Sequence, residues 1–323
     1  MTPSPDGFDW TFVDGEIVPS ARATVSVRAN ALNYGTGVFE GIRATWNEER
    51  GELYVLEPLD HFRRMARSAR IMGLPLAHSP EELVDATLEL LRRNEVRQHA
   101  YVRPLLVLSA DALAVRMHDV DALLSIAITA LPGHYIKPGG IRCMVSSWRR
   151  APDDAVPSRA KTTGGYVGPA LAKTEAVRAG FDEAILLTAG GHLCEGTTSN
   201  VFVRRGAEWV TPPPTDDILE GITRRQVMAL IAEELEETVV QRSIDRSELY
   251  AADEVMLCGT AVQIAPVVEI DHRPVGDGAV GRRAARLLER LRAIARGDDE
   301  RHVAWTVPVY SSVPTRATEE QPA

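Results

Sequence analysis

Hydrophobic and polar positions in the first part of the chain predict short strands combined with amphipathic helices. Apolar pairs stand on both sides of Asp14-Gly15, a dipeptide typical of a two-residue β-hairpin turn. Ser79-Pro80-Glu81-Glu82 matches a capping box with proline at the first helical position, and apolar residues at helical spacing follow it. Further apolar patterns predict a helix over 58–72 and strands over 100–109 and 122–131.

The second part of the chain lies beyond a stretch rich in proline and glycine at 132–140 and has the same mixed character. Its expected strands lie at 141–147, 183–188, 200–204, 238–242, 254–258 and 267–270. Its expected helices lie at 168–178, 223–235 and 280–296. So many short strands favour a strongly curved or closed sheet.

These patterns and the length of 323 residues predict an α+β protein of two domains. We expect a small α/β domain at 1–131, an interdomain linker at 132–140 and a larger domain with a curved, barrel-like sheet at 141–310. Residues 311–323 are rich in Pro, Thr, Glu and Gln, and we expect them to form a mobile tail.

Composition and charge narrow the function classes. The formal net charge of −9 argues against a nucleic-acid binder with a basic surface. The N-terminus does not resemble a signal peptide, and no apolar run is long enough to span a bilayer. Cys143, Cys194 and Cys258 are far apart and match neither a metal site nor a disulfide framework. A reducing cytoplasm is therefore the expected compartment.

The lysines restrict where amine chemistry can occur. Only three of the 36 Lys and Arg residues are lysines, namely Lys137, Lys161 and Lys173. Lys161 lies in the segment Ser-Arg-Ala-Lys-Thr-Thr-Gly-Gly-Tyr, whose small residues would allow a flat ligand to approach the backbone. Most lysines are solvated surface residues. A structural and a catalytic role for Lys161 therefore both remain open at this point.

Other candidate motifs are weak when each is taken alone. Glu195 lies between two expected strands, where a glutamate is usually exposed. Thr223 begins a helix and could cap it or help to bind a phosphate at the helix N-terminus. Thr260 lies in a second small-residue turn, and Tyr101 and Arg103 share one face of an expected strand. The chain has no P-loop, no HExxH, no GxSxG and no dinucleotide fingerprint.

Taken together, eight ordered segments resemble the fold-type IV pyridoxal-phosphate aminotransferases, and within them the branched-chain amino-acid aminotransferases. The resemblance covers roughly residues 8 to 306. The segments that carry it are ALNYGTGVFEGIR (31–43), HFRRMARSARI (61–71), YVRPL (101–105), MVSSWRR (144–150), KTTGGY (161–166), EGTTSNVF (195–202), EGITR (220–224) and LYAADEVMLCGTA (249–261).

The resemblance implies a role for each matching residue. Lys161 corresponds to the lysine that bonds covalently to the cofactor aldehyde, and Glu195 to the carboxylate that faces the pyridine nitrogen. Arg64, Ile222, Thr223 and Thr260 correspond to the phosphate cradle, Tyr166 to the tyrosine on the phenolic oxygen, and Leu219 to the apolar residue on the ring. The positions around the substrate correspond to Tyr34, Phe39, Gly41, Arg43, Tyr101, Arg103, Thr260 and Ala261.

The implied function is a cytoplasmic, pyridoxal 5'-phosphate-dependent aminotransferase. It would exchange the amino group between L-Leu, L-Ile or L-Val and 2-oxoglutarate by a ping-pong mechanism, and Arg43 or Arg103 would receive the glutamate carboxylate. The expected assembly is a homodimer or higher homo-oligomer, in which the partner supplies some site residues, without nucleic-acid or membrane partners.

Three alternatives remain open. The first is an (R)-selective amine or D-amino-acid transaminase. The second is a lyase of the aminodeoxychorismate type, and the third is a binding protein that kept the fold without activity.

Overall fold

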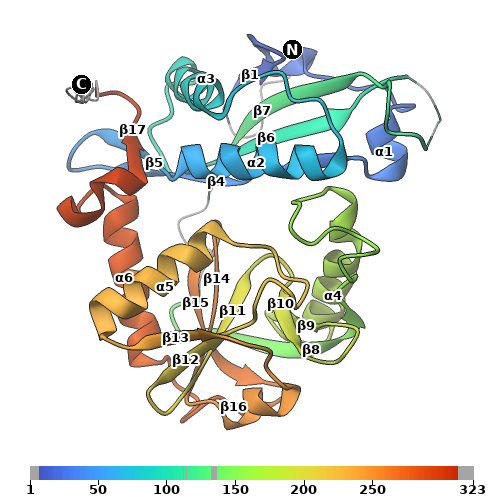
Figure 1. Cartoon of the computed structure of the whole chain (residues 1–323). Coiled ribbons are helices and arrows are strands. Elements are labelled where there is room, and N and C mark those ends of the chain that lie inside the picture. The colour runs from blue at the N-terminus through green and yellow to red at the C-terminus, as the bar shows by residue number, and fades with distance from the viewer. Residues whose placement is uncertain (1–6, 112, 114, 132–136, 312–323) are drawn as a thin grey trace, which may run out of the picture.

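The computed structural model describes residues 7–111, 113, 115–131 and 137–311. It has two parts, each built on its own sheet. Helix α2 (Pro58–Met72) lies along the side of the first part that faces the second, and helix α6 (Arg282–Ala295) lies beside the second part and leads toward the first (Figure 1). Most of the expected linker, at 132–136, and the tail at 312–323 lie outside the described residues. The first sheet takes its strands from residues 10–130 and 306–308, and the second from residues 141–274.

The first sheet has eight strands among the described residues, in the order β17-β5-β4-β6-β7-β1-β2, with β3 paired to β6. The predicted hairpin is present, because Asp14 (φ 45°) and Gly15 (φ 99°) turn the chain between its first two strands. The strands are β1 (Trp10–Val13), β2 (Glu16–Pro19), β3 (Gly37–Phe39), β4 (Ile42–Asn47), β5 (Glu52–Leu56), β6 (Ala100–Leu108), β7 (Ala122–Ala130) and β17 (Thr306–Pro308).

Two helices of the first domain lie where the sequence predicts them. They are α2 (Pro58–Met72) and α3 (Pro80–Arg93), and a short α1 (Asn30–Tyr34) precedes β3. The capping box at the start of α3 is complete, because Ser79 Oγ accepts from the backbone of Glu82 and the Glu82 side chain accepts from the backbone of Ser79. Apolar residues of both helices and of the sheet form one buried core.

The second sheet has nine strands among the described residues, in the order β10-β9-β8-β15-β14-β11-β12-β13, with β16 paired to β15. Leu193 N–H donates to the Ile244 carbonyl at 2.8 Å, so the two ends of this order approach each other and the sheet is strongly curved. The strands are β8 (Ile141–Arg149), β9 (Glu183–Leu187), β10 (Leu193–Gly196), β11 (Asn200–Arg205), β12 (Glu208–Thr211), β13 (Thr238–Gln241), β14 (Glu254–Gly259), β15 (Gln263–Ile270) and β16 (Arg273–Pro274).

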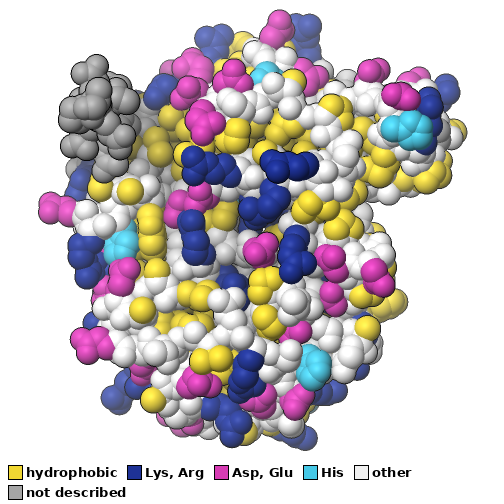
Figure 2. All heavy atoms as spheres, viewed as in Figure 1, with side chains coloured by type: hydrophobic (Ala, Val, Ile, Leu, Met, Phe, Trp, Pro, Cys, Tyr) yellow, Lys and Arg dark blue, Asp and Glu magenta, His cyan; other side chains and the backbone are white. Residues whose placement is uncertain are grey.

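Three helices cover the outside of the curved sheet, and each matches a predicted helix to within two residues. They are α4 (Val167–Arg178), α5 (Ile222–Leu235) and α6 (Arg282–Ala295). Aliphatic residues of α5 and α6 pack on β11, β12, β14 and β15, while α4 packs on β8 and β9. Lys and Arg side chains gather over α2 and along the junction beneath it (Figure 2). Short 3-10 turns lie at Ser20–Arg22, Gly164–Tyr166, Arg246–Ala251 and Glu300–Trp305.

The C-terminal segment differs from the expected domain division. Beyond α6 it crosses back, and β17 pairs antiparallel with β5 of the first sheet. Val309 is fully buried in the first core, and Glu52 accepts from the backbone N–H groups of Val309, Tyr310 and Ser311. Residues 306–310 were expected in the second domain. The position of β17 is set by its pairing with β5, which is distant in the sequence, and three residues have too short a pattern to predict this pairing.

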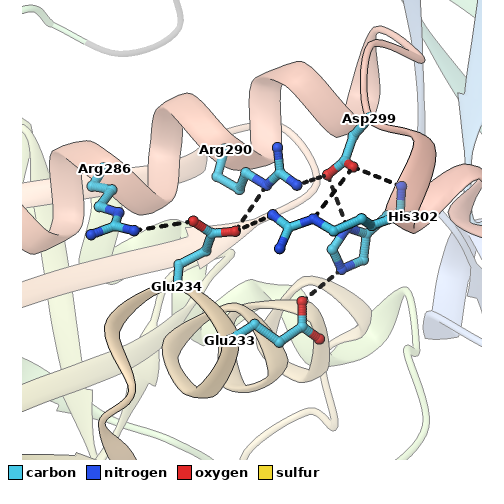
Figure 3. Close-up of polar contacts among 7 residues, drawn as sticks. Glu233, Glu234, Arg286, Arg290, Asp299 and His302 are labelled. Carbon is cyan, nitrogen blue, oxygen red and sulfur yellow. Dashed lines mark hydrogen bonds and ion pairs between the residues drawn. The ribbon is translucent and has the colours of Figure 1, made fainter.

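A cluster of charged side chains attaches this segment to the helices of the second domain (Figure 3). His302 Nδ1 lies 2.9 Å from Asp299 Oδ2, and its Nε2 lies 2.8 Å from Glu233 Oε2 on α5. Asp299 also forms an ion pair with Arg290 of α6. Further ion pairs of the cluster join Glu234 to Arg286, Arg290 and Arg301, and Arg301 also to Asp299.

Among the helices that the structure describes, none combines the length and the apolar character that a membrane crossing requires.

Candidate active site

Lys161 lies where the two domains meet. Its backbone N–H donates to Ser68 Oγ on α2 at 3.1 Å, and its carbonyl accepts from Phe39 N–H at 3.0 Å. Both partners belong to the first domain, so the segment that carries the lysine is anchored across the junction. Lys161 Nζ donates to Tyr166 Oη at 2.6 Å, and both side chains line two adjoining cavities. The amine is therefore accessible to a ligand and already oriented by the tyrosine.

The first cavity is small and polar, and Arg64 forms part of its wall. Arg64 donates to both oxygens of Glu40, through Nε at 2.7 Å and Nη2 at 2.8 Å, and Nη1 donates to the Glu220 carbonyl at 3.1 Å. His61 Nδ1 lies 2.7 Å from Glu40 Oε2. Burial works to raise the pKa of Glu40, but Arg64 and His61 outweigh it and hold this pKa well below its usual range. Arg64 is thus a fixed cation inside the protein.

Helix α5 begins at the same cavity without a capping side chain. Its N-cap is Gly221, with extended backbone, and none of the described side chains accepts from the first turn as a cap. Ile222 and Thr223 line the cavity there, together with Thr260 of the turn after β14. The free N–H groups and the positive end of the helix dipole suit an anion such as phosphate. The four predicted cradle residues are therefore brought to one cavity.

Glu195, at the end of β10, is a buried carboxylate in the wall of this cavity. Its Oε2 accepts from Leu219 N–H at 3.1 Å and from Asn200 Nδ2 at 3.2 Å. Its Oε1 lies 3.4 Å from Arg150 Nη2. Gly221 makes room for this arrangement, because a Cβ there would lie 2.0 Å from Asn200 Oδ1. Burial raises the pKa of Glu195 above its ordinary value, although Arg150 acts to lower it.

The second cavity is larger and has mainly apolar walls. Arg103 lies at its side, with its guanidinium 4.7 Å from the centre of the Phe39 ring and Nη2 donating to Tyr101 Oη at 3.3 Å. Gly41 is required next to this tyrosine, because a Cβ would lie 1.7 Å from Tyr101 Oη. The predicted residues that line this cavity are Phe39, Gly41, Arg64, Tyr101, Arg103, Lys161, Tyr166, Thr260 and Ala261, joined by Leu105, Leu131 and Val262.

Two predicted substrate residues do not line either cavity in this chain. Arg43 is buried, with Nε donating to the Thr260 carbonyl at 3.0 Å and Nη2 to the Ala261 carbonyl at 2.6 Å. Burial and the nearby Arg292 lower the pKa of Arg43 to about 10. Its contacts fix the turn that carries Thr260. Tyr34 ends α1, is 42% exposed, and lines neither of these two cavities.

Several polar residues of the site were not singled out from the sequence. Glu40, His61 and Ser68 support Arg64 or the backbone of Lys161, while Arg150 and Asn200 contact Glu195. All five fall inside or beside the quoted segments, so their position was visible but their contacts were not. Except for Asn200, which shares a segment with Glu195, each of these residues contacts a partner in another segment, which a single segment cannot reveal.

The comparisons with known proteins agree with this fold and site. The family model described as amino-transferase class IV matches residues 37–270, so the chain belongs to this family. Within the family it is similar to branched-chain-amino-acid aminotransferases. A probable branched-chain-amino-acid aminotransferase of Aquifex aeolicus is 44% identical over 302 residues, which cover 94% of this chain and 97% of the relative.

Solved structures show the same likeness. The branched-chain aminotransferase of Thermoproteus uzoniensis with norvaline has a TM-score of 0.89 and 41% identity, and the match covers 93% of this chain and 99% of that chain. The branched-chain amino acid aminotransferase of Thermobaculum terrenum in its PLP-form has a TM-score of 0.89 and 33% identity, over 94% of this chain and 99% of that chain. The family and the fold class predicted from the sequence are thereby confirmed.

Proposed function

We propose that this protein is a branched-chain amino-acid transaminase that uses pyridoxal 5'-phosphate. It exchanges the amino group between L-leucine, L-isoleucine or L-valine and 2-oxoglutarate. One observation carries the proposal: Lys161 lines both cavities, of which one is polar and suits an anion and the other is mainly apolar. An amine at that position can reach a cofactor in the first cavity and a substrate in the second.

The residues of the polar cavity fit this cofactor. Arg64, the N-terminus of α5 and Thr260 would hold the phosphate, and the buried carboxylate of Glu195 would hold the proton on the ring nitrogen. Tyr166 would hold the phenolic oxygen, and Leu219 would pack on the ring. When bound, pyridoxal phosphate supplies the electron sink that stabilises negative charge at the substrate Cα.

The protein's own groups supply position and proton transfer. The amine of Lys161 would hold the cofactor covalently through its aldehyde and, when not engaged in that bond, would be the base that takes the proton from the substrate Cα. Tyr166 Oη, 2.6 Å from this amine, keeps it directed at the cavity. The hydrogen bonds that join the backbone of Lys161 to Ser68 and Phe39 hold this backbone, and with it the lysine, in one position relative to the cavities.

The second cavity explains how one site could take both an aliphatic and an acidic substrate. Phe39, Leu105 and Val262 offer apolar walls for a branched side chain. Arg103 lies at the same cavity and can receive the distal carboxylate of 2-oxoglutarate. Because Arg43 is engaged by two backbone carbonyls, we assign the carboxylate to Arg103 and the fixing of the turn to Arg43.

We further infer a homodimer in the cytoplasm. Tyr34 is exposed together with Leu32 and Val27 on the segment around α1, and these residues would be covered by a second subunit. Light scattering should give twice the monomer mass. The three cysteines are buried free thiols, as is usual in a reducing compartment.

Borohydride reduction followed by peptide mass mapping tests the cofactor assignment. A pyridoxyl adduct is expected on Lys161 alone. Lys137 and Lys173 are internal controls, because each is paired with an acidic residue outside the polar cavity. An adduct on either control, or no adduct, would contradict the proposal.

Amino-donor assays test the substrate assignment. With 2-oxoglutarate as acceptor, L-leucine should react, whereas D-alanine and an (R)-arylalkylamine should react far more slowly. Faster transfer from either of these donors would favour the D-amino-acid or (R)-amine alternative. Release of pyruvate from aminodeoxychorismate without an amino acceptor would instead indicate a lyase.

A further inference from the structure

Arg150 brings a positive charge next to Glu195. It follows β8, and its side chain is only 12% exposed. Nη2 lies 3.4 Å from Glu195 Oε1, and Nε donates to the Asp217 carbonyl at 3.3 Å. Asp217 belongs to the loop that leads to Leu219, whose N–H donates to Glu195. Arg150 is thus joined to the carboxylate and to the loop that orients it.

The charge of Glu195 depends on this neighbour. A carboxylate that is removed from water favours its neutral form unless a cation or hydrogen bonds compensate. Glu195 receives two hydrogen bonds, from Leu219 and Asn200, but its charged contact is the one with Arg150. In return, Glu195 and its neighbours raise the pKa of Arg150 above its ordinary value, although burial works to lower it.

We propose that Arg150 is a positioning residue that keeps Glu195 ionised and oriented, so that Glu195 would keep a proton on the ring nitrogen of a cofactor bound in the polar cavity. This inference rests on the proposed function. Without the guanidinium, the buried carboxyl group favours its neutral form and no longer stabilises a positive ring nitrogen. The electron sink is then weaker, so the loss falls on the chemical step and not on substrate binding.

The first test compares the parent holoenzyme with R150M and R150K. R150M should lower kcat for L-leucine by about tenfold or more, as expected when the partner of a site group is removed, with little change in KM. The visible absorption of the bound cofactor should titrate at a different pH than in the parent. R150K should recover part of both properties. R149M is the matched control, because Arg149 is the exposed neighbour at the end of β8 and should leave kcat unchanged.

A double-mutant cycle separates this role from a general structural one. If Arg150 acts through Glu195, then R150M combined with E195Q should be no slower than E195Q alone. Losses that multiply, or an R150M enzyme with the parent's kcat and titration, would overturn the inference. If R150M does not fold in a thermal melt, R150K within the same cycle decides the question. A parent protein that binds no pyridoxal phosphate would instead overturn the proposed function.

Discussion

At the scale of single residues, the site is built from charges that the protein keeps buried by pairing them. Glu40 is fully buried, yet it stays ionised because Arg64 contacts both its oxygens and His61 contacts one. Breaking such a pair leaves an uncompensated charge in the interior, which costs far more than losing a surface ion pair. Arg64 is therefore held in place before any ligand arrives.

Glu40→Gln tests this argument. The variant should lower the free energy of unfolding of the cofactor-free protein by about 3 kcal/mol, because Arg64 loses its ionic partner inside the protein. Denaturant titration at pH 7 measures the difference. Glu81→Gln is the control, because Glu81 is exposed and lies 3.7 Å from an exposed Arg63, so the change should be under about 0.5 kcal/mol.

The free energies of unfolding of the parent and of Glu40→Gln should also differ in how they depend on pH. The pKa of folded Glu40 lies below that of the unfolded chain, so its stabilisation is present above about pH 4.5 and is lost as the pH falls. The stability difference between the parent and Glu40→Gln should therefore narrow on acidification below about pH 4.5. A difference that is constant between pH 7 and pH 3 would show that folding does not lower the pKa of Glu40.

At the scale of elements, the sequence predicts most clearly those features whose cause is local. The Asp14-Gly15 hairpin, the capping box before α3 and the apolar stripe of α2 are all present where their patterns lie. Strands β3, β4, β5, β10, β12, β16 and β17 were not foreseen, because their pairing with neighbouring strands places them in the sheets and their own patterns do not mark them.

The site shows the same division between local and distant causes. Lys161, Arg64 and Glu195 could be placed because each lies in a recognisable segment. Arg150 and His61 could not be given roles, because their contacts join residues 45 and 21 positions apart in the chain. That Arg43 turns toward backbone carbonyls and not toward the cavity also depends on the packing of two domains.

Ser79→Ala tests the local contribution of one helix start. The hydroxyl accepts from Glu82 N–H at 3.2 Å, and its loss leaves a donor of the first turn without this partner. The free energy of unfolding should fall by about 1 kcal/mol, as measured by urea denaturation. Glu89→Ala, on the exposed face of the same helix, should change it by less than about 0.5 kcal/mol. Equal losses in the two variants would contradict the capping argument.

At the scale of the whole molecule, the C-terminal segment joins the two domains that share the active site. It leaves α6, is attached to α5 through His302, and ends as a strand beside β5 in the other domain. The connection is relevant to the site because the opposite end of α5, at Ile222 and Thr223, lines the polar cavity. A substitution that disrupts this segment should therefore weaken the packing of the two domains against each other, and not only the packing of the C-terminus.

Two carboxylates on His302 allow this connection to be tested with a matched pair of variants (Figure 3). The side chain of Asp299 is 2% exposed and that of Glu233 is 43% exposed, although both lie within hydrogen-bond distance of the imidazole. Burial works to raise the pKa of Asp299, but His302, the Arg301 backbone and Arg290 outweigh it, so this carboxylate is ionised at neutral pH. Asp299→Asn should therefore lower the free energy of unfolding by about 3 kcal/mol, and Glu233→Gln by less than about 1 kcal/mol.

Chemical denaturation of the two variants measures these values. Their affinity for pyridoxal phosphate reports whether the loss of stability also changes the polar cavity at the N-terminus of α5. The affinity should fall in Asp299→Asn, which weakens both the contact with His302 and the ion pair with Arg290 of α6. It should remain closer to the parent value in Glu233→Gln, because a glutamine amide at this half-exposed position can still hydrogen-bond to His302. Equal destabilisation by the two variants would show that burial does not set the strength of this cluster. An unchanged affinity in a destabilised Asp299→Asn protein would show that the C-terminal connection supports the fold without supporting the site.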